Sequence, residues 1–437
     1  MEVKPTTVPP ATQVGEVWAR WAWVEPSVWT ERMLTALEQG VRGGVWFSLI
    51  DKVYARHNLA AATAKVVGNQ GAAGVDHVTV EQFLHSVDAN LKDLGDQLRQ
   101  GSYQPQAIRR VYIPKPGSTE QRPLGIPTVR DRVVQTAIVY VLEPIFERDF
   151  APTSYGFRPG RGAQQALARV EELLAAGYRY VVDADLKSYF DTIPHDQLLQ
   201  RVRAKVADGR LLQLLESFLK AGILEGLEEW TPTAGAPQGA VLSPLLSNIY
   251  LDPLDRLMAS RNEGMVRYAD DFVILCRTRA EADQALAEVQ AWVEANGLTL
   301  HPTKTRIVDA ASEAFDFLGY RFDRDKRLVR PKSLDKLKAT VRAKTKRTDG
   351  RSLACIIADL NRTLRGWHGY FGRCWVRVHS SLDGWIRRRL RSLLRKRRRL
   401  KGISRHGEDE KRWPNRFFAA QGLFSLKAAH EAVVNPL

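Results

Sequence analysis

Two short apolar segments that end in acidic residues constrain the fold of this chain most strongly. Residues 178–186 (YRYVVDADL) are rich in β-branched and aromatic side chains, which predicts a strand that ends near Asp185. Residues 265–275 (MVRYADDFVIL) indicate two apolar strands joined by a turn that carries Asp270 and Asp271. Adjacent carboxylates at a hairpin tip repel each other, so this pattern is unfavourable unless a cation lies between them.

If the two segments form neighbouring antiparallel strands, the carboxylates of Asp185, Asp270 and Asp271 converge. Hard oxygen ligands suit Mg²⁺, and nucleotidyl transfer uses two such ions about 3.5–4 Å apart. A bare Asp-Asp pair is more often a solvated turn, but the apolar flanks favour a metal site. Asp183 is expected to have a structural role, and Asp191 is expected to order the turn after the first strand.

Charge and composition indicate the kind of partner. The 65 Lys and Arg residues outnumber the 49 Asp and Glu residues, which gives a formal charge of +16 and predicts binding to phosphate-rich molecules. The chain has 437 residues, 44% of them hydrophobic, which is enough for two or more domains. Cys276, Cys355 and Cys374 are too scattered for a disulfide framework, so we expect buried thiols in a reducing compartment. The sequence predicts a soluble protein without a signal peptide or a membrane span.

The pattern of the chain changes along its length. Tryptophans at helical spacing near the N-terminus, such as Trp29, predict packing onto the main body rather than base stacking. Strands and helices then alternate with Pro and Gly punctuation from Asn58 to Phe322. From Lys326 onward the pattern becomes helical and strongly basic, which indicates a domain boundary and an α+β fold class.

The acidic motifs resemble those of a known family. Tyr-Ala-Asp-Asp between apolar runs, downstream of Asp-Leu-Lys-Ser-Tyr-Phe-Asp, is similar to the palm of reverse transcriptases. The resemblance implies that Asp185 and Asp270 are metal ligands supported by Asp271. It also implies that Lys304, within HPTKT, protonates pyrophosphate. The implied enzyme is an RNA-directed DNA polymerase with a right-hand fold, in which fingers and a helical thumb flank a palm with an antiparallel sheet.

Further motifs resemble the family's nucleotide pocket. Lys115 in IPKP and Arg122 in QRPLGIP are expected to hold the triphosphate. Phe190 is expected to exclude a ribose 2′-hydroxyl and so favour dNTPs, and Gln238 in APQG is expected to touch the incoming nucleotide. Ala240 stands where relatives commonly carry a second glycine, which is a departure in chain geometry but not in chemistry.

Basic motifs resemble RNA-binding parts of the same family. The GFRPGR segment is expected to lie near the template, and GWHGYF and GWIRRRL resemble a maturase thumb. A single basic helix is usually a solvated face, but several in succession with interleaved tryptophans predict a groove for RNA. The arginines expected to bind RNA or template are Arg158, Arg161, Arg395, Arg397, Arg398 and Arg399.

The resemblance covers nearly the whole chain and is closest to bacterial group II intron-encoded reverse transcriptase/maturases. The implied domains are an N-terminal extension (1–57), fingers and palm (58–325), the maturase thumb (326–400) and a short DNA-binding segment (401–437). No Cys pairs or His-Asn-His pattern follow Leu426, which predicts the type that lacks the endonuclease.

Such a protein would act in the bacterial cytoplasm. Its expected partners are a group II intron RNA, an RNA template with a DNA primer, a DNA target, dNTPs, two Mg²⁺ ions and a second copy in a homodimer. It would assist intron splicing and copy the intron into cDNA during retrohoming.

Three alternatives remain open at the level of sequence. One is a splicing cofactor without essential polymerase activity, although the intact acids, Phe190 and Gln238 argue against it. Another is an RNA-dependent RNA polymerase, which Phe190 and the maturase-like thumb disfavour. A retron or domesticated repair polymerase would share the palm and differ mainly in its genomic setting.

Overall fold

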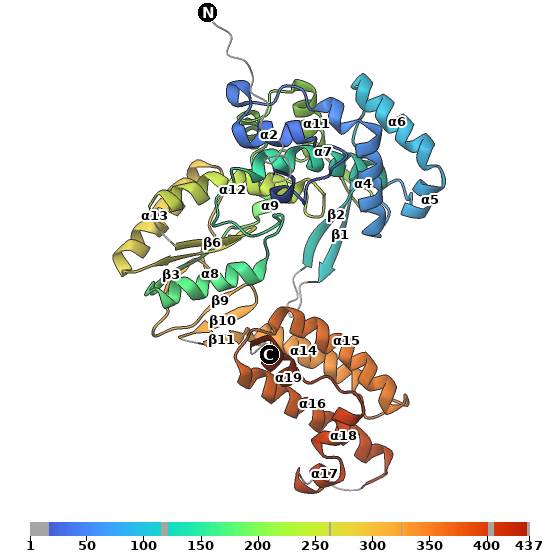
Figure 1. Ribbon diagram of the computed structural model, residues 1–437, viewed down its shortest axis with the longest axis vertical. Coiled ribbons are helices and arrows are strands. Elements are labelled where there is room, and N and C mark those ends of the chain that lie inside the picture. The colour runs from blue at the N-terminus through green and yellow to red at the C-terminus, as the bar shows by residue number, and fades with distance from the viewer. Residues whose placement is uncertain (1–16, 115–120, 262–263, 325, 401–405, 435–437) are drawn as a thin grey trace, which may run out of the picture. The chain divides into compact units, whose positions relative to one another are not determined.

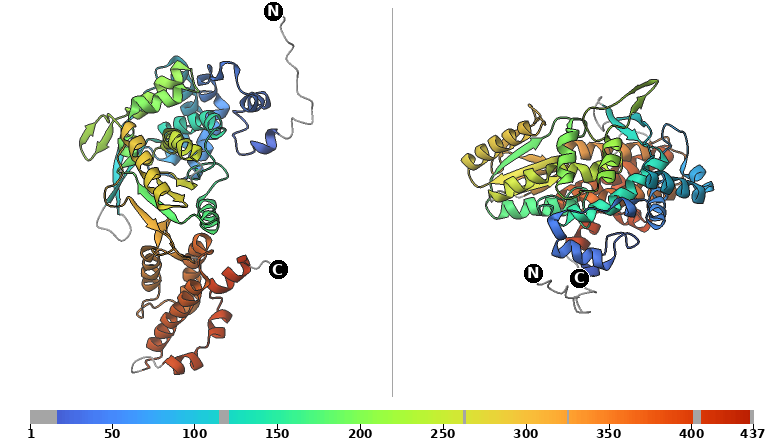
Figure 2. Two further views of the ribbon diagram at one scale, coloured as in Figure 1. Left: turned by 90° about the vertical axis from the view of Figure 1, so that its left-hand side faces the viewer. Right: turned by 90° about the horizontal axis from the view of Figure 1, so that it is seen from above.

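The computed structural model describes residues 17–114, 121–261, 264–324, 326–400 and 406–434. The chain forms two compact units, of which the first extends to Ile307. The second begins at Val308 and also includes Arg179–Val181, so it starts before the predicted domain boundary at 326. The mixed helices and strands of both units confirm the α+β fold class (Figures 1 and 2).

The first unit is built from helices and the strands of two sheets. Its helical elements are α2 (Glu31–Gln39), η1 (Arg42–Gly44), α3 (Ile50–Val53), α4 (Arg56–Gly68), α5 (Val80–His85), α6 (Val87–Gln100), α7 (Val129–Glu147), α8 (Ala163–Ala175), α9 (Tyr189–Thr192), α10 (His195–Arg203), α11 (Gly209–Leu219), α12 (Ser243–Ser260) and α13 (Arg279–Ala295). Its strands are β1 (Ile108–Pro114), β2 (Gln121–Ile126), β3 (Tyr180–Asp185), β4 (Ile223–Glu225), β5 (Glu228–Trp230), β6 (Gly264–Tyr268), β7 (Asp271–Cys276) and β8 (Arg306–Asp309), of which β3 and β8 contribute residues to both units.

The N-terminal tryptophans pack onto the first unit, as their spacing predicts. Trp29 is fully buried, and its ring lies 5.5 Å from that of Trp46 in an edge-on arrangement. The Trp29 Nε1 donates a hydrogen bond to the backbone oxygen of Tyr140 at 2.8 Å, which ties the segment to α7. A buried indole with its polar atom satisfied is a structural anchor rather than a surface for base stacking.

One four-stranded sheet carries the acidic motifs, in the order β6-β7-β3-β8. Helices α8, α12 and α13 pack against it. In β3 the side chains alternate: Val182 and Ala184 are buried, whereas Asp183 and Asp185 are half-buried on the other face. Helix α13 starts at a capping box, in which Thr278 and Glu281 satisfy each other's backbone amides.

A second sheet has the order β2-β1-β4-β5. Strands β1 and β2 form an antiparallel hairpin that projects from the helices around it (Figure 1). Strand β1 also pairs in parallel with β4, where Ile108 lies opposite Ile223. The hairpin therefore continues into a sheet whose other edge lies next to the cavity described below.

The second unit combines a three-stranded sheet with a set of helices. Its sheet has the order β11-β10-β9, with bounds of Phe315–Phe317 for β9, Tyr320–Asp323 for β10 and Lys326–Val329 for β11. Its helices are α14 (Pro331–Lys344), α15 (Leu353–Phe371), α16 (Val376–Arg397), α17 (His406–Arg412), α18 (Asn415–Ala420) and α19 (Leu426–Val434).

Contacts within the second unit explain why its boundary precedes residue 326. The Tyr370 hydroxyl of α15 donates to the backbone oxygen of Leu318 at 2.8 Å, and the Tyr320 ring lies 5.1 Å from Phe371. The strands that precede 326 are thereby packed with the helices that follow it.

The last helices share the core of this unit. Trp413, Phe418 and Leu426 are buried in the same hydrophobic cluster as Leu364 of α15 and Leu390 of α16. The 401–437 segment is therefore, in its described part, integral to the helical core. No helix in the described ranges is long and apolar enough to span a bilayer.

The cysteines are partly as expected. Cys276 and Cys374 are buried, but Cys355 is exposed at the start of α15, so the expectation of three buried thiols was wrong at that position. Cys355 is the third residue of the helix and lies off the buried stripe that includes Ile356 and Leu360.

Candidate active site and nucleic-acid surface

The Tyr-Ala-Asp-Asp segment forms a tight turn between two paired strands. Tyr268 and Asp271 lie opposite each other in the β6–β7 register, so Ala269 and Asp270 are the two residues of the turn. Strand β7 adjoins β3, and β3 ends at Asp185. The predicted adjacency of the two acidic segments is therefore present.

The carboxyl groups of Asp185 and Asp270 influence each other. The pKa of Asp270 is raised above its ordinary value, first by burial and then by the negative charge of Asp185, although Arg122 and Arg267 counteract this. Asp271 is exposed at the start of β7. No group of three or more His, Cys, Asp or Glu side chains able to hold a metal occurs among the described residues, so the role of Asp271 as a third acid stays a prediction.

Lys304 lies beside Asp185. Its Nζ donates to the Asp185 Oδ2 at 2.5 Å, and its side chain is 60% exposed. The loop that carries it is fixed to the end of β3, because the amide of His301 donates to the backbone oxygen of Asp185 at 2.7 Å. Lys304 and Asp185 are thus direct partners, and their roles as proton donor and metal ligand stay predictions.

This arrangement suits a divalent cation. Asp185 and Asp270 offer hard carboxylate oxygens, and their mutual repulsion would be relieved by a positive ion between them. In this structure the Lys304 ammonium supplies a positive charge at Asp185. The donor chemistry of the two acids therefore fits Mg²⁺. A bound Mg²⁺ would replace the Lys304 ammonium at Asp185 or lie beside it.

Phe190 lies on α9, just after strand β3, and lines a cavity. The cavity has a volume of about 340 Å³ and is also lined by Arg110, Asp191 and Trp230. The backbone oxygen of Phe190 accepts a hydrogen bond from the amide of Ala236 at 2.7 Å, which joins the two predicted motifs. Asp191 faces this cavity, and burial raises the pKa of its carboxyl. A partly buried aromatic ring at the edge of a polar cavity could select among sugars by shape.

The APQG motif lies against the β1–β2 hairpin. The amide of Gly125 donates to the backbone oxygen of Gln238 at 2.6 Å. Gly239 has a φ of +103°, and a Cβ there would come within 2.5 Å of the Gly125 oxygen, so a side chain is excluded.

Arg122 lies on the same strand as Gly125, whereas Lys115 lies outside the described residues. Gln238 is half-buried, and its contact with a nucleotide stays a prediction.

The GFRPGR arginines are less available to a template than expected. The Arg158 side chain is 3% exposed, forms a salt bridge to Glu147 at 2.7 Å and donates to the Ala151 oxygen at 2.6 Å. A phosphate could reach this guanidinium only if a buried ion pair were broken, and the template contact of Arg158 stays a prediction that this burial disfavours. Arg161 is half-buried and donates to the Pro152 oxygen at 2.8 Å, which leaves its template role a prediction.

The arginines at the end of α16 and just after it also differ in their contacts. The Arg395 side chain is 13% exposed and bonds Asp409, itself 3% exposed, at 3.0 Å. This ion pair gives Arg395 a structural contact, and its role as an RNA ligand stays a prediction. Arg397, Arg398 and Arg399 are exposed. Arg397 donates to backbone oxygens of the loop before α15, including that of Asp349 at 3.1 Å.

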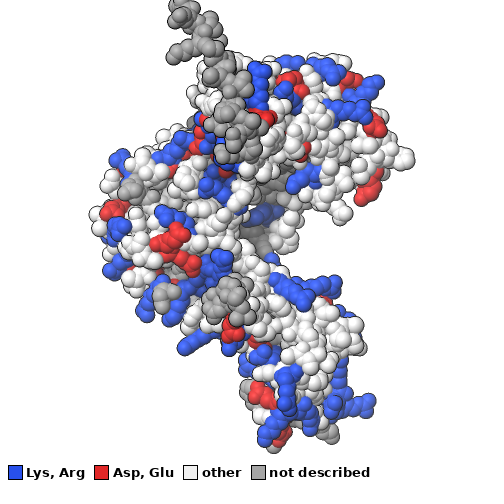
Figure 3. All heavy atoms as spheres, viewed as in Figure 1, with Lys and Arg blue, Asp and Glu red and all other residues white. Residues whose placement is uncertain are grey.

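Sequence reasoning did not single out a basic cavity in the second unit. It has a volume of about 320 Å³ and is lined by Thr345, Arg347, Trp385, Arg388, Arg389 and Ser392, without an acidic residue. The charges of Arg342 and Arg347, after burial, lower the pKa of Arg389, which indicates that positive charge is concentrated there. The feature of the sequence that could have indicated this cavity is Trp385, which lies within a basic helix. On the face drawn in Figure 3, basic side chains outnumber acidic ones over this unit.

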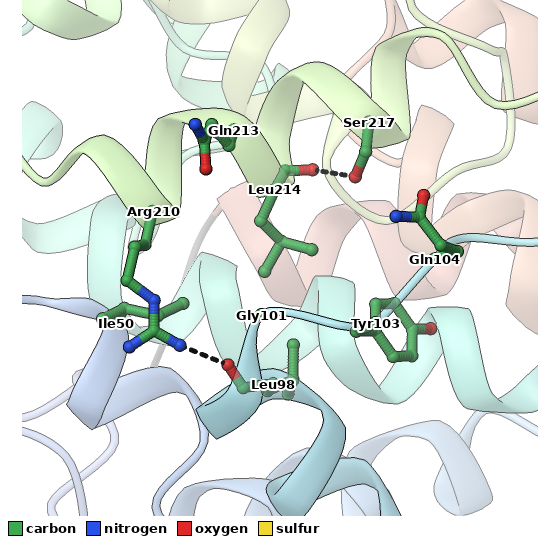
Figure 4. A pocket seen from close by; sticks show the side chains of 9 residues that line it. All are labelled: Ile50, Leu98, Gly101, Tyr103, Gln104, Arg210, Gln213, Leu214 and Ser217. Carbon is green, nitrogen blue, oxygen red and sulfur yellow. Dashed lines mark hydrogen bonds between the residues drawn. The ribbon is translucent and has the colours of Figure 1, made fainter.

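Another cavity, of about 160 Å³, lies between α11 and the end of α6 (Figure 4). Its lining includes Arg210, which donates to the backbone oxygen of Leu98 at 2.7 Å, and Tyr103. Arg210 thereby satisfies a carbonyl at the C-terminal end of α6. This cavity contains none of the predicted catalytic acids and is not a candidate active site.

Comparisons with known proteins match two parts of the chain to described families. Residues 113–322 match the family described as reverse transcriptase (RNA-dependent DNA polymerase), and residues 334–413 match the group II intron, maturase-specific domain. The chain is 35% identical over 347 residues to protein YkfC of Escherichia coli (strain K12), a match that covers 70% of this chain and 86% of YkfC. It is 39% identical over 199 residues to the group II intron-encoded protein LtrA of Lactococcus lactis subsp. cremoris, with 45% of this chain and 33% of LtrA covered.

A solved structure of the partial Cas6-RT-Cas1--Cas2 complex also matches, with a TM-score of 0.37 and 26% identity over 56% of this chain and 42% of that chain. The acidic turn and β3 lie within the residues matched as reverse transcriptase, and the basic cavity lies within those matched as maturase-specific. Polymerases of the first kind use divalent metal ions. The chain belongs to the group II intron reverse transcriptase/maturase family.

Proposed function

We propose that this protein copies RNA into DNA with two Mg²⁺ ions and acts on a group II intron RNA, whose splicing and mobility it supports. The observation that carries the proposal is the juxtaposition of Asp185 and Asp270, with Lys304 and Arg122 supplying positive charge around them. Paired carboxylates next to cationic side chains match the needs of phosphoryl transfer, in which charge must be neutralised at both the attacking and the leaving oxygen.

The residues of the first unit would divide the work. Asp185 and Asp270 would hold the metal ions, which when bound activate the primer 3′-hydroxyl and stabilise the leaving pyrophosphate. Arg122, on the fingers hairpin, would bind the triphosphate through its planar guanidinium. Lys304, whose Nζ lies at Asp185, would give a proton to the leaving pyrophosphate.

Selection of dNTPs would depend on Phe190. Its backbone is fixed to Ala236, and its ring is held edge-on against Tyr189 at 5.3 Å, so it cannot move aside freely. Tyr189 is in turn buried, and its hydroxyl donates to the backbone oxygen of Ser247 at 2.9 Å. A rigid ring can reject a 2′-hydroxyl by steric exclusion, whereas a mobile one would yield.

Binding of the intron RNA is assigned to the basic cavity around Trp385 and to the exposed run Arg397–Arg399. The cavity brings several guanidinium groups together without carboxylates, so phosphate binding would relieve repulsion and release counterions. The indole of Trp385 lies 5.7 Å from the guanidinium carbon of Arg389, which orients that arginine. The negative charge of RNA phosphates suits such a surface.

Primer extension tests the polymerase proposal. A DNA primer annealed to an RNA template should be extended with dNTPs and Mg²⁺, and extension should stop with EDTA. Incorporation of NTPs in preference to dNTPs would favour an RNA-dependent RNA polymerase instead. RNA binding without any extension would favour a splicing cofactor, because the second unit would then act while the carboxylates of the first unit remained catalytically silent.

A further inference from the structure

The turn that carries Asp270 has a backbone conformation that needs support. Ala269 has a φ of +60°, in the left-handed region that residues other than glycine rarely adopt. In a two-residue hairpin turn, a positive φ at the first position is normally provided by glycine. Because alanine occupies this position, the surrounding structure must hold the turn in place.

A fully buried arginine contacts the turn directly. Nη1 of Arg267 donates to the Ala269 backbone oxygen at 2.8 Å and to Oδ1 of Asn248 at 3.0 Å. The Nε and Nη2 atoms of the same guanidinium donate to Asp255 at 2.8 and 2.6 Å, and both members of this ion pair are 0% exposed. Asn248 and Asp255 both lie on α12, so one helix fixes the guanidinium from two sides.

Asn248 also fixes the other neighbour of the turn. Its Nδ2 donates to the Gly156 backbone oxygen at 2.9 Å. A Cβ at Gly156 would come within 2.3 Å of the Ala269 nitrogen, so the glycine backbone lies directly against the turn. The amide of Tyr155 donates to the Arg267 oxygen at 2.8 Å, which joins this segment to β6 as well. Helix α12 is thereby linked to the acidic turn through the Asn248 carboxamide and the Arg267 guanidinium.

We propose that Asn248, Asp255 and Arg267 form a clamp that holds the Ala269–Asp270 turn so that the Asp270 carboxylate is aimed at Asp185 before metal binds. The functional part of this inference rests on the proposed polymerase activity. Asn248 and Arg267 are positioning residues: Arg267 donates to the turn backbone, Asn248 holds Arg267 and Gly156 beside it, and neither contacts the reacting atoms. The clamp explains why a charged side chain lies within an otherwise apolar strand.

Two physical points separate this clamp from an ordinary structural ion pair. A buried ion pair contributes little net stability compared with apolar side chains of similar volume, so stability alone does not explain its presence. The geometry also requires the planar fork of arginine, since one guanidinium bonds the Asp255 carboxylate, the Asn248 carboxamide and the Ala269 carbonyl at once. Lysine has one nitrogen and could not span these acceptors.

The test compares Asn248→Ala with Asn58→Ala in the full chain. Both asparagines are buried, and Asn58 donates to the backbone oxygens of Lys52 and Ala137, away from the acidic turn. Asn248→Ala leaves the Arg267–Asp255 pair in place, so the palm should still fold. Amide exchange in a peptide spanning residues 264–276, measured without metal or nucleotide, should rise about tenfold in Asn248→Ala and stay unchanged in Asn58→Ala.

Primer extension adds a second readout. A displacement of about 1 Å in a reacting group can cost about 10²-fold in rate. We therefore expect Asn248→Ala to lower kcat by up to about 10²-fold and to raise the Mg²⁺ concentration needed for half-maximal activity, with little change in the KM for dNTP. Lysine in the variant Arg267→Lys should not be able to hold the turn, so amide exchange in the 264–276 peptide of this variant should resemble that of Asn248→Ala.

The outcomes are distinguishable. Equal amide exchange at the turn in both asparagine variants would overturn the clamp, whatever the activity. Exchange that rises only in Asn248→Ala, in a protein whose wild type does not extend primers, would support the clamp and reject the polymerase proposal. If both variants lose the same amount of thermal stability but differ at the turn, the effect is one of positioning rather than of general destabilisation.

Discussion

The ammonium of Lys304 lies 2.5 Å from a carboxylate oxygen of Asp185, so the expected proton donor and the expected metal ligand neutralise each other in this structure. This pairing gives Lys304 two opposing effects. It competes with a metal ion for the same carboxylate, and it holds the Lys304 amine beside the place where the proposed reaction would release pyrophosphate.

The pair leads to a prediction for Lys304→Gln. Loss of a general acid typically slows a reaction by about 10²–10⁴-fold, so kcat should fall in that range. Loss of the competing ammonium should lower the Mg²⁺ concentration required for half-maximal activity. Steady-state primer extension across a Mg²⁺ series measures both quantities, with Lys338→Gln on α14 as the control. A higher Mg²⁺ requirement in Lys304→Gln would contradict the competition.

Replacement of Asp270 should remove catalysis without unfolding the protein. Asp270→Asn keeps the size of the side chain and removes its charge, and the pKa of this buried carboxyl is already raised by burial and by Asp185. Extension should become undetectable, whereas thermal stability and RNA affinity should stay close to the wild type because repulsion at Asp185 is relieved. Extension at the wild-type rate would exclude Asp270 as a metal ligand.

Phe190→Ala should admit ribonucleotides. The ring lines the cavity next to Arg110 and Asp191, and its removal enlarges the space for a 2′-hydroxyl. The ratio of kcat/KM for dNTP to that for rNTP should fall, with the main change in rNTP use. Tyr112→Ala, on the exposed part of the hairpin, is a suitable control. An unchanged ratio would assign sugar selection to another residue.

The basic residues of the second unit should separate into two classes. Arg347→Gln and Arg388→Gln, at the cavity, should each reduce the log–log salt slope of RNA binding by about 0.7–0.9 with little change in stability. Arg395→Gln should instead destabilise the unit by about 3–5 kcal/mol, because it removes the positive charge that Arg395 places beside the buried Asp409 carboxylate. Filter binding across a salt series and urea unfolding distinguish the two; equal effects from all three variants would refute the division.

The second unit should lose stability in mild acid. Burial, followed by the charges of His430 and His368, lowers the pKa of His379 from 6.5 to about 4, although Asp383 opposes this; the Cys374 thiol also faces the ring. Because the unfolded state binds a proton first, stability is full above pH 6.5 and falls as the pH drops towards 4, by roughly 3 kcal/mol. Urea unfolding followed by tryptophan fluorescence should show this fall in the wild type and a flatter profile in His379→Gln. Parallel profiles would mean that His379 is not responsible.

Much of the candidate site could be predicted because its signals are local. Alternation in β3 places Asp185 on the open face, and the apolar flanks of Asp270 define a hairpin, so both could be located from short stretches of sequence. The partner of each arginine could not be predicted in this way. Arg158 pairs with Glu147, and Arg395 pairs with Asp409, through contacts that depend on how the helices and loops fold back.

The same limit explains the unexpected parts of the site. Arg267 could be noticed as a charge within an apolar strand, but its acceptors on α12 come from tertiary packing. The start of the second unit before residue 326 likewise depends on contacts between Tyr370 and Leu318, which are distant in sequence.

The sheet in which β1 pairs with both β2 and β4 has a mechanical consequence. Arg122 lies on one edge of this sheet, and Ile223, which lines the cavity of Phe190, lies on β4 two strands away. A force that a bound triphosphate exerts on the hairpin would therefore be transmitted through β1 to β4 and so to the wall of the cavity. Contact with the phosphates and selection of the sugar would in this way be mechanically coupled.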